Sequence, residues 1–200
     1  MDKIYATREE WLTAAVEELR AVFDAKAAPV AANIRVTCGF PLTAKRSGSI
    51  GECWADTASA DKVMEIMISP TLADTYRVMD VLVHELCHTT AGSMNHGVNF
   101  KKSADAMHLI PSAGKAGYKA TTGGDKFKAA FAPIIDSLGA YPHGALTVSS
   151  RKVQTTRMLK AVCPCCDYSI RLSAKWAALG LPNCSNPDCG DAQFQLVGAA

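Results

Sequence analysis

The chain has 200 residues, of which 48% are hydrophobic and 20% charged, a balance that excludes an intrinsically disordered protein. The net charge is +2, but residues 1–100 carry 9 Lys and Arg against 13 Asp and Glu, whereas residues 101–200 carry 12 against 6. No apolar run approaches the roughly 18 residues of a membrane span, and the N-terminal MDKIYATREEW lacks the apolar segment of a signal peptide. We expect an intracellular protein, cytoplasmic or at the nucleoid or nucleus, without a membrane partner.

The first predicted element is an amphipathic helix over residues 7–26. Thr7 and Glu10 form the capping-box pattern, in which each side chain bonds the backbone beside the other. Pro29 marks the end of the helix. The apolar residues follow at helical spacing: Trp11, Ala15, Leu19, Val22 and Phe23.

Residues 33–68 predict a small antiparallel sheet. Ile34, Val36 and Cys38 alternate with polar residues, and two further strands are expected at 50–55 and 63–68. The last strand, VMEIMIS, is either an interior strand or an edge strand that could receive a peptide by backbone hydrogen bonds. The pattern leaves both alternatives open.

Helices are predicted over 72–91, 98–107 and 126–138. Gly92 fits the C-terminal cap of the first of them. The segment PSAGKAGYKATTGGDK is rich in Gly and Lys and is typical of a mobile surface loop. Together with the strands, these helices predict an α+β fold.

The helix over 72–91 carries the motif HELCH. Residues four apart lie on one face of a helix, so His84 and His88 would direct their imidazoles at one zinc ion. Glu85 lies about 100 degrees round the helix, where it can act as a general base without binding the metal. The chain can turn back after Gly92, which makes His96 the natural third ligand.

Other zinc-peptidase patterns fit less well. A metzincin requires Gly and His where this chain has Ala91 and Met94, and a gluzincin requires a downstream Glu where only Asp105 is near. His108 is a fallback ligand, and His143 has no assigned role.

HELCH, followed by HG and by Phe100, Lys101 and Lys102, resembles the zinc metalloprotease domain of the SprT-like (Spartan) family over about residues 5–140. The resemblance implies a minimal zincin fold, a small sheet packed on helices that include the HExxH helix. It implies His84, His88 and His96 as zinc ligands, Glu85 as the base, and protein substrates attached to DNA.

The C-terminal segment has the cysteine spacing of a zinc ribbon. Cys163 and Cys166 form one pair and Cys184 and Cys189 the other, separated by 17 residues, so four thiolates can hold one structural zinc. Cys165 is a fifth cysteine that could replace a member of the first pair. The segment CDYSIRLSAKWAALGLPNC also resembles the SprT-like C-terminal ribbon.

The sequence therefore predicts two domains, a SprT-like metalloprotease domain over 1–150 and a basic linker with a four-cysteine zinc ribbon over 151–200. The expected cofactors are one catalytic and one structural Zn²⁺. A basic run at the start of the second domain is a candidate nucleic-acid contact, with single-stranded DNA as a partner. Its residues are Arg151, Lys152, Arg157 and Lys160.

Two functions fit this pattern. The first is a zinc metalloendopeptidase that cleaves nucleic-acid-associated proteins by a zinc-activated water with Glu85 as general base. The second is a nucleic-acid-binding or transcription-associated zinc-ribbon protein with an inactive HExxH domain. The presence of Glu85 favours the first, because an inactive domain has no need of a carboxylate between two ligands.

Overall fold

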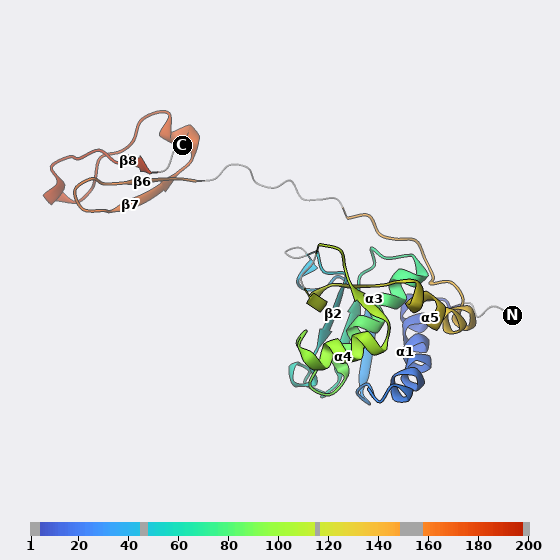
Figure 1. Ribbon diagram of the computed structural model, residues 1–200. Helices are drawn as coiled ribbons and strands as arrows, with labels where there is room; N and C mark the ends of the chain where they lie inside the picture. The colour runs from blue at the N-terminus through green and yellow to red at the C-terminus, as the bar shows by residue number, and fades with distance from the viewer. Residues whose placement is uncertain (1–4, 45–47, 115–116, 149–157, 198–200) are drawn as a thin grey trace. The chain divides into compact units, whose positions relative to one another are not determined.

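The computed structural model describes residues 5–44, 48–114, 117–148 and 158–197. The chain forms two compact units, residues 1–148 and 149–200 (Figure 1). The domain boundary expected at residues 150 and 151 lies outside the described residues. In the described part of the chain, no helix has the length and apolar character that crossing a membrane requires.

The first unit contains helices and short strands in alternation. In chain order, its elements are α1 (Arg8–Ala25), β1 (Ile34–Cys38), β2 (Gly51–Trp54), η1 (Asp56–Ala58), β3 (Met64–Ile68), α3 (Thr75–Thr89), α4 (Val98–Ala106), β4 (Leu109–Pro111), η2 (Gly117–Lys119), β5 (Thr121–Gly123) and α5 (Asp125–Leu138). The fold is mixed α+β, as the sequence predicts.

The capping box predicted for α1 is confirmed. The Thr7 hydroxyl accepts a hydrogen bond from Glu10 N at 3.2 Å, and the Glu10 carboxylate accepts from Ala6 N and Thr7 N. The apolar face of the helix is buried in the core, where Trp11 also donates a hydrogen bond to Gly139 O. The N-terminus of α1 is thus fixed both by its own cap and by packing.

The sheet of the first unit has the strand order β1, β3, β2. β2 is antiparallel to β3, but β1 is parallel to β3, so the prediction of an antiparallel sheet is wrong for this pair. Alternation of apolar residues predicts strands but not their order, and here β2 lies on the far side of β3 from β1. The segment VMEIMIS, which contains β3, is therefore interior, and β2 is an edge strand among the described residues.

Helix α3 is the central element of the first unit. It contacts β2, β3, β5, α4 and α5, and most of its residues from Val78 to Thr89 are buried. Asp74 caps its N-terminus by accepting a hydrogen bond from Arg77 N at 2.7 Å. A helix fixed by so many neighbours can hold side chains in a defined geometry.

The hairpin of β4 and β5 replaces part of the predicted surface loop. Leu109 pairs with Gly123 and Pro111 with Thr121, in antiparallel register. The interpretation of the segment from Pro111 to Lys126 as a mobile loop is therefore wrong for β5. Strands of three residues that contain Pro or Gly carry too little alternation to be recognised.

The second unit is a small three-stranded sheet with short helical turns. Its elements are β6 (Leu159–Val162), β7 (Ser169–Leu172), α6 (Ala174–Ala177), η3 (Pro187–Cys189) and β8 (Gln195–Val197), and the strand order is β7, β6, β8. Its core holds few apolar side chains, chiefly Ala161 and Phe194, and is completed by buried cysteines. So small a core needs a further source of stability.

Candidate metal centres

Three histidine side chains converge in the first unit. His84 and His88 lie one turn apart on α3, and His96 reaches them from the turn before α4. His84 Nε2 and His96 Nε2 are 3.3 Å apart, and one ring nitrogen of each histidine lies within 4.8 Å of the other two. Tetrahedral zinc with Zn–N bonds of 2.0–2.1 Å holds its nitrogens about 3.3–3.4 Å apart, so the cluster can hold such an ion.

The opposite ring nitrogens of two histidines have protein partners. His88 Nδ1 lies 2.9 Å from Ser93 O, and His84 Nδ1 lies 2.8 Å from Thr121 Oγ1. Because a carbonyl oxygen only accepts, His88 must carry its proton on Nδ1, which leaves the Nε2 lone pair for a metal ion. Phe100 packs against the rings of all three histidines.

Burial keeps the histidines neutral. Removal from water, followed by the neighbouring histidines, lowers the pKa of His84 to about 3. Burial lowers the pKa of His88 to about 4. Burial also lowers the pKa of His96, and the positive charge of Lys119 lowers it further. Neutral imidazoles are the form that binds metal ions.

Glu85 lies beside the histidines on the side of α3 that faces β2. Its side chain is buried, and the backbone of Gly51 lies directly against its carboxylate. Burial, and then the charge of Glu52, raises the pKa of Glu85 to about 8 in the absence of a metal ion. A bound cation would act in the opposite direction and favour the carboxylate.

The four residues open into one cleft of about 770 Å³. Gly51, Glu52 and Cys53 of the edge strand β2 line this cleft, and so do Lys119 and Thr121. Glu52 also fixes the rim of the cleft, because its carboxylate accepts hydrogen bonds from Leu42 N and the Thr43 hydroxyl. One carboxyl group and three imidazoles therefore line a single cleft.

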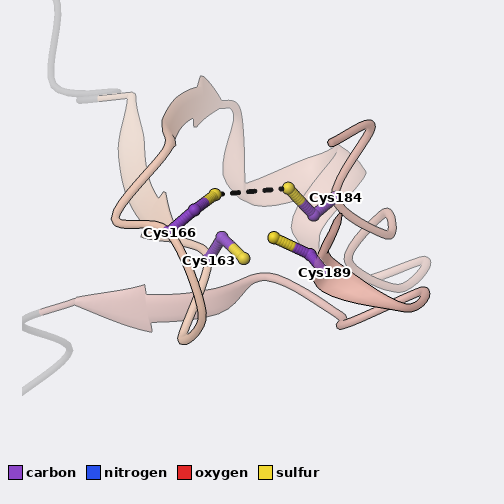
Figure 2. A group of neighbouring side chains, drawn as sticks. All are labelled: Cys163, Cys166, Cys184 and Cys189. Carbon is purple, nitrogen blue, oxygen red and sulfur yellow. Dashed lines mark hydrogen bonds between the residues drawn. The ribbon is translucent and has the colours of Figure 1, made fainter. Parts of the chain in front are cut away.

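Four cysteine side chains converge in the second unit, as Figure 2 shows for Cys163, Cys166, Cys184 and Cys189. Their sulfurs lie within 4.8 Å of one another, and the Sγ atoms of Cys166 and Cys184 are 3.7 Å apart. Zn–S bonds of about 2.3 Å place the sulfurs of a tetrahedral site about 3.8 Å apart. These four residues can hold a metal ion and fit zinc.

The turn between β6 and β7 explains why Cys165 is not in this group. The Cys165 side chain is exposed, and its backbone N–H donates to Cys163 Sγ at 3.4 Å. Asp167 adopts a left-handed conformation, with φ of 60°, and so completes the turn that glycine often completes. Burial raises the pKa of Cys163, but hydrogen bonds from the backbone N–H groups of Cys165 and Cys166 and from the thiols of Cys184 and Cys166 lower it, and together they bring the pKa to about 7.

The remaining predicted residues lie elsewhere. His108 is not in the histidine cluster, and His143 Nε2 lies 3.0 Å from Ala6 O. Arg151, Lys152 and Arg157 lie outside the described residues. Lys160 is exposed on β6, opposite Arg171 of β7.

Sequence reasoning missed the residues that support the cluster. Thr121, Ser93 and Gly51 each contact one of its side chains. Ser93 lies within one turn of α3 and could have been expected from its position, but the contacts of Thr121 and Gly51 depend on the tertiary fold.

Comparisons of the chain with protein-family models, curated proteins and solved structures gave no match. The geometry of the two clusters is therefore the main observation that bears on function.

Proposed function

We propose that the first unit is a zinc-dependent metalloendopeptidase of the SprT-like type and that the second is a zinc ribbon. The observation that carries this proposal is the convergence of His84, His88 and His96 on one point, with buried Glu85 beside them in an open cleft. A purely structural zinc site is closed by four protein ligands, whereas three ligands leave a position for catalysis.

Zinc held by the three histidines supplies a Lewis acid that polarises a water molecule and the scissile carbonyl. Glu85 then takes the proton of the attacking water and delivers it to the leaving amide nitrogen. Burial alone raises the pKa of Glu85, and a bound zinc ion would lower it again and so favour the carboxylate, which is the form that can accept a proton. Gly51 leaves the carboxylate room beside β2.

The edge strand β2 supports a peptide substrate bound in extended form. One edge of β2 pairs with β3, and residues 51–53 also line the cleft. An extended peptide can add to such an edge by backbone hydrogen bonds, which read little of its sequence. A peptidase with this mode of binding would accept unfolded segments of many proteins.

The resemblance to the SprT-like family adds the substrate class, proteins attached to nucleic acid. The ribbon carries exposed Lys160 and Arg171 side by side on β6 and β7, which favours contact with phosphates. The alternative is a zinc-ribbon nucleic-acid-binding protein with an inactive first unit. Both functions predict metal in the chain, but only the first predicts cleavage.

The test is to count zinc per chain and to follow cleavage of an unfolded protein, with and without single-stranded DNA. We expect two zinc ions per chain, cleavage that a chelator abolishes, and recovery when zinc is restored. Zinc-loaded protein that cleaves neither an unfolded protein nor itself under any of these conditions would refute the peptidase and favour the alternative.

A further inference from the structure

One side of α3 carries a line of polar residues toward β5. Arg77, Asp80 and His84 are spaced by three and four residues, so they lie along one face of the helix. Thr121, the first residue of β5, is buried and bonds the last of them, with its Oγ1 2.8 Å from His84 Nδ1. This strand lies 37 residues after the histidine in sequence, so the contact is purely tertiary.

The other two residues hold β5 in place. Asp80 is buried and accepts hydrogen bonds from Gly123 N at 3.1 Å and from Arg77 Nη1 at 2.6 Å. Arg77 in turn reaches Thr121 O at 3.5 Å. The Thr121 hydroxyl therefore belongs to a strand that is fixed to α3 one turn before the histidine it contacts.

The Thr121 hydroxyl differs from the partner of His88 in one respect. Ser93 O can only accept, but a hydroxyl can donate or accept and so does not by itself choose the tautomer of His84. The metal-facing nitrogen of His84 is Nε2, which lies 3.3 Å from His96 Nε2. If Nε2 offers its lone pair to a metal ion, Nδ1 carries the proton and Thr121 Oγ1 must accept it.

We propose that Thr121 is a positioning residue of the histidine site. Its hydroxyl accepts the Nδ1 proton of His84 and holds the ring with Nε2 toward His88 and His96, while Asp80 and Arg77 fix the strand that presents it. This inference rests on the metal site of the proposed function, but it concerns metal binding and not cleavage.

The experiment compares zinc affinity in three variants by competition with a chelator. Thr121→Val is nearly isosteric but lacks the hydroxyl, and we expect it to bind zinc in the first unit roughly 10–100-fold more weakly than the parent. Thr121→Ser restores a hydroxyl and should recover most of the affinity. Thr122→Val is the matched control, because it makes the same change on the same strand at a residue that contacts Asp80 and no histidine.

Equal zinc affinity in Thr121→Val and the parent would overturn the proposal. An equal loss in Thr121→Val and Thr122→Val would also overturn it, because the effect would then belong to the strand. If Thr121→Val does not fold, spectra of the zinc-loaded parent decide: the His84 Nδ1 proton should exchange slowly with solvent because Thr121 Oγ1 accepts it, and an Nδ1 proton that exchanges as fast as that of an exposed histidine would refute the role. A chain that passes these tests but cleaves no protein would refute only the peptidase.

Discussion

Gly51 of β2 lies so close to Glu85 of α3 that a Cβ atom at residue 51 would overlap the carboxylate oxygen Oε1 and come within 2.7 Å of Val81 Cγ1. The backbone of the edge strand therefore forms the wall against which the proposed base rests. Because the contact joins the proposed substrate-binding strand to the proposed catalytic side chain, it can be tested without touching either the histidines or Glu85.

Gly51→Ala should displace the Glu85 carboxylate while leaving the three histidines in place. We expect zinc content close to that of the parent and a fall in the rate of protein cleavage of about 10²-fold, since a displacement of about 1 Å can have this effect. Gly144→Ala is the control, because a Cβ atom there meets nothing within 4 Å. Cleavage by Gly51→Ala at the rate of the parent would show that the position of Glu85 does not matter.

The zinc-free protein should be most stable near pH 6.5. Burial lowers the pKa of His84 to about 3 and of His88 to about 4, so below their ordinary value of about 6.5 the unfolded chain binds two protons that the folded chain does not. Stability is therefore lost as pH falls from 6.5. Glu85 acts in the opposite direction, because its pKa is raised to about 8 and above pH 4.5 the folded chain holds one proton that the unfolded chain has released. Two protons on the histidines outweigh this one, so the free energy of unfolding still decreases as pH falls.

In the first unit, the Glu85 contribution dominates above pH 6.5, and it has the opposite sign. Between about pH 6.5 and 8 the folded chain holds a proton on Glu85 that the unfolded chain releases, so stability should fall as pH rises. Urea unfolding of zinc-free protein at pH 5, 6.5 and 8, followed by the helical circular dichroism signal, measures this. Glu85→Gln should remove the fall above pH 6.5, and a fall of the same size in that variant would refute its assignment to Glu85.

The sequence predicts the parts of this site that depend on local spacing. The positions of His84, Glu85 and His88 follow from one helical turn, and the cap of α1 follows from Thr7 and Glu10. Cysteine spacing likewise indicates the four residues that converge in the ribbon, although only the three-dimensional turn separates Cys166 from Cys165.

The parts that the sequence does not predict depend on how distant segments pack. The parallel pairing of β1 with β3 depends on which side of β3 the strand β2 occupies, and no local pattern records this. Thr121 lies in a segment whose glycines and lysines are typical of a loop. The segment nevertheless forms β5, because tertiary hydrogen bonds to Asp80 and Arg77 hold it, and strand propensity does not record these bonds.

Cys184→Ser should loosen the second unit and leave the first folded. A structural zinc site supplies much of the folding free energy of so small a domain. Limited proteolysis should then trim the chain near residue 155 and leave a stable fragment of the first unit. Cys165→Ser is the matched control, because Cys165 is exposed and outside the group. If both variants resist protease equally, Cys184 is not a ligand of a structural metal.

The second unit should bind single-stranded DNA weakly and with a steep dependence on salt. Lys160 and Arg171 are cross-strand neighbours with exposed side chains, so both can face a phosphate backbone. Changing both to Gln should lower the slope of log affinity against log salt by about 0.7 for each phosphate that the variant no longer neutralises. Lys26→Gln, at the end of α1, is the control. Binding that does not change with salt would contradict this role.

Glu85→Gln tests the chemistry most directly, because it is nearly isosteric and leaves His84, His88 and His96 in place. Folding and zinc content should persist, while cleavage of an unfolded protein should fall by about 10²–10⁴-fold, since an amide can neither take the proton of water nor deliver it to the leaving nitrogen.

His88→Ala should instead lose the zinc of the first unit, because it removes a ligand whose tautomer is fixed by Ser93 O. Zinc and cleavage measured together in both variants separate loss of the base from loss of the metal. A glutamine variant that cleaves as fast as the parent would leave Glu85 without a catalytic role, and because the histidines and the metal are unchanged in it, no other explanation would rescue the mechanism.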